Sequence, residues 1–270
     1  MILSFHYSTS QPINQSTNAM YFKVVTIFPQ MFDSFWNHGI IRRALEDKKI
    51  FASAVNIRNY AEDRHQVTDD RPYGGGSGMV MKPEPLAAAI RDASQTLTGT
   101  KTVLLTPQGR VFNQKMAWEL ATSDGLILVC GRYEGVDERI CHDLIDYEIS
   151  IGDYVLTGGE PAAMIIIDAV TRLIPGALGG EDAAEKDSFS DDLLEHAHYT
   201  RPGNFEGQEV PEVLLSGHHQ EIEKWRLESS VMRTLLKRPD LLLQNKNLNR
   251  QQRDILKKWR FEIEKILDSQ

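Results

Sequence analysis

The chain has 270 residues, of which 41% are apolar and 25% charged, an ordinary composition for a globular protein with a sizeable buried core. Its net charge of −8 argues against a protein that coats nucleic acid nonspecifically. We find no apolar run of about 18 residues and no signal-peptide pattern at the start, so we predict a cytoplasmic protein without membrane contact.

The two cysteines agree with a reducing compartment. Cys130 ends the apolar run Leu126–Val129 and is best interpreted as a small buried residue. Cys141 stands apart from it, and two unclustered cysteines support neither a disulfide framework nor a zinc site.

The first patterned segment begins at Met20. Residues 1–19 are rich in Ser, Gln, Thr and Asn, and we interpret them as a flexible extension or the result of a start codon placed too early. β-branched and aromatic runs then predict strands. These strands cover Tyr21–Phe28, Phe51–Ile57, Thr102–Thr106 and Leu126–Cys130.

Helices are predicted between and after these strands from apolar residues at helical spacing. They cover Met31–Lys49, Leu86–Leu97, Gln114–Thr122 and Glu138–Leu144, and one further helix begins at Pro161 and runs to Leu173. Strands that alternate with helices predict an α/β fold, in which a parallel sheet is covered by helices on both faces.

An acidic segment follows this region. Residues 179–195 carry seven acidic side chains and one lysine, a composition typical of a mobile linker. Beyond it, Glu221–Leu236 and Arg250–Leu267 predict amphipathic helices of a small second domain. We therefore divide the chain into an extension (1–19), a sheet domain (20–178), a linker (179–196) and a helical domain (197–270).

Charge is distributed unevenly. From Gly217 onward there are 12 Lys and Arg against 8 Asp and Glu, so the C-terminal region is basic on an acidic body. Such a region could grip a phosphate backbone locally, or it could consist of solvated helix faces.

The usual nucleotide-binding signatures are missing. No G-x-G-x-x-G follows a strand, and the glycines at 74–78 lack the Lys-Ser/Thr that completes a P-loop. Glycines instead gather in loops after predicted strands, where ligands bind in open parallel sheets. They are Gly131, Gly135, Gly152, Gly158 and Gly159, which could alternatively serve only tight turns.

Several polar, glycine-rich motifs follow one another in the order of a known family. They are Asp63-Arg64-His65 through Asp69-Asp70-Arg71-Pro72-Tyr73-Gly74, Gly131-Arg132-Tyr133-Glu134-Gly135, Ile151-Gly152-Asp153-Tyr154-Val155-Leu156-Thr157-Gly158-Gly159-Glu160, Asp187-Ser188-Phe189 and His198-Tyr199-Thr200-Arg201-Pro202. From about Met20 to the C-terminal helices, the chain closely resembles the bacterial tRNA (guanine-N1)-methyltransferases, the TrmD type of the SPOUT class.

The resemblance implies a sheet whose C-terminal part is threaded as a trefoil knot, with S-adenosylmethionine bound in the knot loops. The implied cofactor-binding residues are Leu105, Pro107, Gly131, Gly135, Ile151, Gly152, Asp153, Tyr154, Val155, Leu156, Gly158 and Gly159. One departure concerns Pro161, which lies one place earlier than in the family pattern, so a cofactor contact by this proline is not carried over.

The resemblance also assigns the chemistry. The proton on guanine N1 must leave as the methyl group arrives, so a base near N1 and a cation near O6 would both lower the barrier. By resemblance, Asp187 is that base and Arg172 stabilises the developing charge. Taken alone, Asp187 could be a solvated linker charge, and Arg172 could pair with Asp168 on a helix surface.

Further partners follow from the same resemblance: a tRNA substrate methylated at guanosine 37, a second copy of the chain in a homodimer, and magnesium. Neither membrane nor DNA is an expected partner, and no metal-ligand spacing is visible in the sequence. The implied RNA-binding residues are Asp69, Tyr133, Glu134, Ser188, His198 and Tyr199.

Three alternatives remain open at this point. The chain could be a noncatalytic RNA-binding protein of the same fold, or a knotted methyltransferase acting on another RNA or another atom. A nucleotide-binding switch is the remaining class, and it would require measurable nucleotide hydrolysis.

Overall fold

The computed structural model describes residues 19–95, 99–179, 184, 187–245 and 248–269, and the chain divides into two compact units, Met1–Glu181 and Asp182–Gln270. Apart from Ala19, the predicted N-terminal extension lies outside the described residues. Among the described helices, none combines the length and the apolar character needed to span a membrane.

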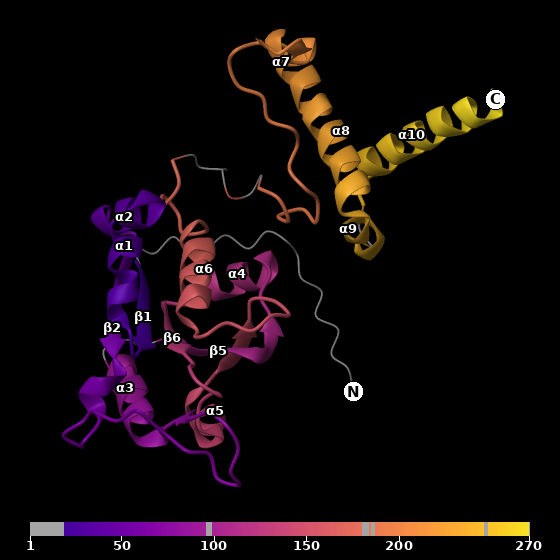
Figure 1. Cartoon of the computed structure of the whole chain (residues 1–270). Coiled ribbons are helices and arrows are strands. Elements are labelled where there is room, and N and C mark those ends of the chain that lie inside the picture. The colour runs from indigo at the N-terminus through magenta and orange to yellow at the C-terminus, as the bar shows by residue number, and fades with distance from the viewer. Residues whose placement is uncertain (1–18, 96–98, 180–183, 185–186, 246–247, 270) are drawn as a thin grey trace. The chain divides into compact units, whose positions relative to one another are not determined.

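A five-stranded sheet forms the centre of the first unit, in the order β2-β1-β6-β5-β7 (Figure 1). Its strands are β1 (Met20–Thr26), β2 (Ile50–Asn56), β5 (Thr100–Val111), β6 (Gly125–Cys130) and β7 (Tyr147–Ser150). Every pairing is parallel, which confirms the predicted α/β sheet. All residues of β6 are buried, as expected for a central strand covered on both faces.

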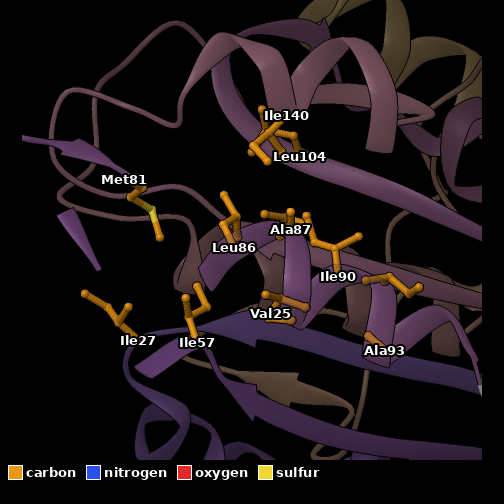
Figure 2. Close-up of a cluster of buried hydrophobic side chains, with 13 residues drawn as sticks. Val25, Ile27, Ile57, Met81, Leu86, Ala87, Ile90, Ala93, Leu104 and Ile140 are labelled. Atoms are coloured by element: carbon orange, nitrogen blue, oxygen red, sulfur yellow. The ribbon is translucent and has the colours of Figure 1, made fainter. Parts of the chain in front are cut away.

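One face of the sheet packs against α3 (Pro83–Gln95) and α5 (Glu138–Leu144). Val25 of β1, Val129 of β6 and Leu104 of β5 are register partners on this face. With Leu86, Ala87 and Ile90 of α3 and Ile140 of α5, they form a buried apolar cluster, part of which Figure 2 shows. Burial of this apolar surface is what fixes α3 and α5 to the sheet.

Helices of the opposite face are α6 (Glu160–Thr171), α4 (Gln114–Ala121) and α2 (Gly39–Glu46). Side chains alternate along a strand, so Phe22, Val24 and Leu128 point away from the α3 cluster, and all three are buried. The α6 helix contacts β1, β6, α4 and α2. Figure 1 shows α3 and α5 on one side of the strands and α4 and α6 on the other.

The predicted single helix over Met31–Lys49 is wrong. The segment instead forms η1 (Pro29–Phe32), α1 (Asp33–Trp36) and α2, with an interruption at Asn37 and His38. Gly39 has φ +61°, in the left-handed region that favours glycine, and this backbone conformation separates α1 from α2. The apolar spacing was helical, but it did not reveal the change of axis.

Shorter elements complete the first unit. They are η2 (Ile57–Tyr60) and the antiparallel pair β3 (Asp69–Asp70) and β4 (Val80–Met81). The predicted helix at Pro161 is confirmed, and it begins one residue earlier, at Glu160. Cys130 is fully buried, as predicted.

The second unit contains α7 (Glu212–Leu215), α8 (His219–Lys237), α9 (Pro239–Gln244) and α10 (Arg250–Asp268), and a ribbon of β8 (Asn204–Phe205) and β9 (Gln208–Glu209). Glu228 of α8 accepts hydrogen bonds from Lys258 Nζ (2.8 Å) and Trp259 Nε1 (3.1 Å) of α10. Trp225 of α8 and Trp259 of α10 are half-buried.

Part of the predicted linker is bound to α8. Leu194 N donates to Thr234 Oγ1 (2.9 Å), Ser230 Oγ donates to Leu194 O (2.5 Å), and Ala197 N donates to Ser229 Oγ (3.0 Å). The C-terminal end of the acidic segment is therefore part of the second unit.

Candidate active site

A cavity of about 400 Å³ lies at the carboxyl ends of β6 and β7, beside the point where β5 leaves its pairing with β6. This is the edge of a parallel sheet at which ligands bind, because the loops there are free of sheet hydrogen bonds. Its walls include Leu104–Gln108 of β5, residues 131–136 after β6, and residues 148–152 and 154–159 around the end of β7. Three loops distant in sequence therefore meet at one site.

The predicted cofactor-binding residues gather around this cavity. All of them line it except Asp153, which is exposed. The lining members are Leu105, Pro107, Gly131, Gly135, Ile151, Gly152, Tyr154, Val155, Leu156, Gly158 and Gly159. The structure brings together residues that the sequence related only by motif order.

The loop after β7 is shaped by local hydrogen bonds. Gly152 has φ +145°, a conformation open to glycine, and its N–H donates to Ser150 Oγ (3.2 Å). Ser150 Oγ in turn donates to Gly152 O (3.0 Å), and the Tyr154 hydroxyl donates to Ile151 O (3.2 Å). These bonds hold the loop in a turn that lines the cavity.

The end of this loop returns to β6. Gly159 N donates to Gly131 O (2.9 Å), and Arg132 and Gly158 form an isolated β-bridge. A Cβ atom at Gly159 would lie 2.8 Å from Cys130 Cα, closer than real side chains approach backbone. Glycine is thus required at position 159 by the close approach of two backbone segments.

A buried ion pair joins the cavity wall, through Arg132, to the start of α6. Arg132 Nη2 is 2.9 Å from Glu160 Oε2, and the side chains are 16% and 0% exposed. Glu160 Oε1 also accepts a hydrogen bond of 2.6 Å from Thr26 Oγ1 at the end of β1. Because Glu160 stands in the first turn of α6, its negative charge also meets the positive end of the helix dipole.

The cavity wall is acidic on balance. Glu134, Glu138 and Glu148 line it, whereas Arg132 is neutralised by Glu160. Burial, followed by the charges of Glu138 and Glu148, raises the pKa of the Cys141 thiol in the same wall. An anionic wall of this kind favours a ligand that carries positive charge.

A second, more open cavity of about 440 Å³ shares a wall with the first. Ile27, Phe28, Gly78 and Met79 line only the second cavity, while both cavities are lined by Arg132, Tyr133, Glu134, Leu156 and Thr157.

The predicted RNA-binding residues Tyr133 and Glu134 lie in the shared wall. Asp69 lies next to them: burial, and then the charge of Asp69 and its hydrogen bond, raise the pKa of the Tyr133 hydroxyl. Tyr133 itself has φ +60°, a conformation that side chains rarely adopt. Asp69, Tyr133 and Glu134 are therefore held as one group beside the second cavity.

The remaining predicted residues lie in two places. Arg172 follows α6 in the first unit, and its N–H donates to Asp168 O (3.1 Å). Asp187 belongs to the second unit, where its carbonyl oxygen accepts a hydrogen bond from Ser190 N (3.3 Å). Their assignments as base and charge stabiliser stay predictions.

Ser188, His198 and Tyr199 are also in the second unit. Ser188 Oγ accepts a hydrogen bond from Glu195 N (3.0 Å), and His198 Nε2 lies 2.8 Å from Glu195 Oε1. The Tyr199 ring is half-exposed, with its centroid 6.1 Å from that of Trp225. An aromatic ring in this state can still stack on a base.

A group of three described residues could share a metal ion: the ligand atoms of Glu195, His196 and His198 lie within 4.8 Å of one another. Imidazole nitrogens suit transition metals, whereas magnesium prefers oxygen ligands. This group therefore does not support the expected magnesium.

Arg132 and Glu160 were missed as functional candidates, although both lie inside the motifs that carry the resemblance. A signal for Glu160 was available, since an acid directly before Pro161 marks a helix N-terminus. Burial of Arg132 had no signal in the sequence. Glu138, Cys141 and Glu148 were also missed, because they line the cavity from elements without glycine.

Comparison with known proteins agrees with this geometry. The family model described as tRNA (Guanine-1)-methyltransferase TrmD matches residues 20–244. A tRNA (guanine-N(1)-)-methyltransferase of Desulfatibacillum aliphaticivorans is 55% identical over 251 residues, which cover 93% of this chain and 95% of that protein. The corresponding enzyme of Carboxydothermus hydrogenoformans is 51% identical over 245 residues, 91% of this chain and 96% of that protein. With such matches along nearly its whole length, the chain belongs to the TrmD family of tRNA (guanine-1)-methyltransferases.

Proposed function

We propose that this enzyme transfers a methyl group from S-adenosylmethionine to N1 of guanosine 37 in tRNA, beside the anticodon, in the cytoplasm. A methyl group at N1 blocks Watson–Crick pairing of that guanine, and the modification thereby helps to maintain the reading frame. One observation carries the proposal: the loops implied to bind the cofactor line a single cavity at the ligand-binding edge of the sheet.

The cavity suits the cofactor in size and charge. Its volume of about 400 Å³ is within the range of small-molecule sites, roughly 300–1,000 Å³. Glu134, Glu138 and Glu148 provide negative charge that favours the sulfonium and amino groups of S-adenosylmethionine. Glycine backbone at positions 131, 152 and 158 allows close approach to adenine and ribose.

The second cavity is the proposed entrance for the target base. It shares Tyr133 and Glu134 with the first cavity, so a guanine there would lie beside the methyl donor. Asp69 positions Tyr133, a residue that is 47% exposed and whose ring could stack on a base. Ser188, His198 and Tyr199 of the second unit are proposed to contact the RNA.

The chemistry assigned to the protein is proton removal and charge stabilisation. When bound, S-adenosylmethionine supplies a methyl group already activated by its positive sulfur, so no covalent enzyme intermediate is needed. Asp187 is proposed to accept the proton from N1, and Arg172 to stabilise negative charge that develops at O6. Bound RNA would exclude water from Asp187 and so favour transfer of the N1 proton to its carboxylate.

Three further features belong to the proposal. Two observations support the trefoil knot. Strand β5 pairs with β6 as far as Leu105 and pairs with β7 again at Arg110 and Val111. In addition, the loop after β7 comes back to the end of β6, where Gly159 N donates to Gly131 O. A homodimer would let each active site use Asp187 from the partner chain. Magnesium is supported by the carboxylates of Asp69 and Glu134, which are oxygen ligands of the kind it prefers; it would add positive charge beside the base.

Methyl transfer from labelled S-adenosylmethionine to unmodified tRNA tests the proposal. We expect incorporation with the wild-type protein and a loss of at least about 100-fold with Asp187→Asn, since removal of a general base costs this much. A tRNA with adenosine at position 37 is the matched substrate control. Methylation of that control would show that the target is another atom, and tight tRNA binding without any transfer would favour a noncatalytic binder.

A further inference from the structure

The Arg132–Glu160 pair connects three segments that form the two cavities. Glu160 begins α6 and accepts from Thr26 Oγ1 at the end of β1 (2.6 Å). Arg132 follows β6, and its Nη1 donates to Thr157 O (3.3 Å) in the loop after β7. The guanidinium also covers the Phe28 ring, at 4.4 Å from the centroid. One side chain therefore touches walls of both cavities.

Arg132 and Glu160 form several directed hydrogen bonds, more than the neutralisation of one buried charge would require. Arg132 Nε lies 3.2 and 3.1 Å from the two carboxylate oxygens of Glu160, and Nη2 lies 2.9 Å from Oε2. A planar guanidinium bound in this way is fixed in orientation, which a lysine ammonium would not be. Arg132 immediately precedes the turn that carries Tyr133 and Glu134.

Stability alone does not explain this pair. Glu160 is fully buried, and moving two charges out of water costs about as much as their attraction returns. An apolar or neutral pair of similar volume is commonly as stable as a buried ion pair. What such a pair lacks is the directed hydrogen bond from Arg132 to Thr157 O, whereas a glutamine at position 160 could still accept from Thr26.

We propose that Arg132 and Glu160 are positioning residues, which hold the shared wall so that the methyl donor and the target base meet in reactive geometry. This inference rests on the proposed function of the two cavities. Neither residue reacts; both act through Tyr133, Glu134 and the Thr157–Gly159 loop. A displacement of about 1 Å in such a wall can reduce turnover by about 100-fold.

The test compares four variants of the full-length protein: Arg132→Lys, Arg132→Met, Glu160→Gln, and the double variant Arg132→Met/Glu160→Gln. Each is measured for melting temperature, for S-adenosylhomocysteine affinity by calorimetry, and for kcat and KM with tRNA per cofactor-binding site. Arg42→Met is the matched control, because Arg42 forms an exposed pair with Glu46 (3.5 Å; 60% and 61% exposed). We expect this control to retain wild-type values.

The single variants to Met and Gln should melt at lower temperature, because each leaves a buried partner group unsatisfied. The double variant should recover most of the melting temperature, yet lose about 10-fold or more in kcat and about 5-fold in S-adenosylhomocysteine affinity. Arg132→Lys keeps the charge and should remain folded, but lose turnover to a similar extent. Normalising to binding sites separates this loss from unfolding.

The inference would be overturned if the double variant or Arg132→Lys stayed within twofold of wild type in both S-adenosylhomocysteine affinity and kcat. Arg132 and Glu160 would then be a purely structural pair. Such a result would not affect the proposed function, since wild-type methyl transfer would stand. Wild-type protein that binds no S-adenosylhomocysteine would overturn both.

Discussion

Replacing Gly159 by alanine tests whether the close approach of the β6 end and the loop after β7 forms the cofactor cavity. Gly159 has ordinary helical backbone angles, φ −78° and ψ −9°, so alanine adds no backbone strain there. The added methyl would instead lie 2.8 Å from Cys130 Cα and 3.2 Å from Gly131 N, both of them backbone atoms. Ordinary contacts begin at about 3.4 Å, so the two segments must separate by about 0.6 Å.

The cost of that separation can be estimated. Overpacking by one methyl group in a dense region costs about 1–3 kcal/mol. If the free protein relieves the clash at little cost by opening the loop, but the cofactor-bound form requires a closed loop, the whole cost appears in binding, which corresponds to about 5- to 150-fold in Kd. If it moves in both forms, the same cost appears as a lower free energy of unfolding.

Calorimetry with S-adenosylhomocysteine and thermal unfolding together detect either result. Gly203→Ala is the matched control, since a Cβ there meets nothing within 4 Å. A Gly159→Ala protein with both the affinity and the melting temperature of wild type would refute the reasoning, because it would mean that the two segments yield without cost.

Three more predictions concern other parts of the chain. Iodoacetamide should modify Cys141 slowly at pH 7 and faster as pH rises, because burial, and then the charges of Glu138 and Glu148, raise the pKa of its thiol. Bound S-adenosylhomocysteine should protect Cys141 from modification, as measured by mass spectrometry. An absence of protection would place Cys141 outside the cofactor cavity. Glu228→Gln should cost about 1 kcal/mol of unfolding free energy at pH 7, because Lys258 holds the pKa of Glu228 below its ordinary value. That stabilisation is present above the ordinary glutamate pKa and is lost as pH falls below about 4.5 toward the folded-state pKa. The melting temperatures of wild type and variant should therefore converge at low pH. A difference in melting temperature that does not change with pH would exclude the ion pair as the cause. Asn249→Ala should cost about 1 kcal/mol by removing the capping box of α10, seen as faster amide exchange in its first turn, whereas Asn249→Asp should retain protection.

Periodicity predicted those elements whose burial repeats regularly. The α5 helix has the predicted bounds because its apolar positions face α3 and the sheet throughout. By contrast, β7 was not predicted, since Tyr147–Ser150 is short and its first two residues are exposed. The sheet residues Arg110 and Val111 of β5 were missed too, because the strand continues beyond the point where its register shifts.

The site was predictable to the extent that backbone shape determines it. Glycines at 152, 158 and 159 mark close approaches, and glycine-rich loops after strands are visible in a sequence. The partnership of Arg132 with Glu160 was not visible, since it depends on a pairing across 28 residues that the closed loop creates. Residues that act through tertiary contacts carry no local periodicity.

The strand order has a consequence for how the protein is made. β6 lies between β1 and β5, so the partner of β1 on that side is synthesised about 105 residues after it. At about 5–20 residues per second, a ribosome needs roughly 5–20 s to deliver β6. During that interval the β1–β2 pair has an open, apolar edge, and such edges invite pairing with other chains. Closure of the sheet on the nascent chain is therefore late and depends on contacts distant in sequence, a topology associated with slow folding. Chaperone binding to this edge during translation would raise the yield of native enzyme.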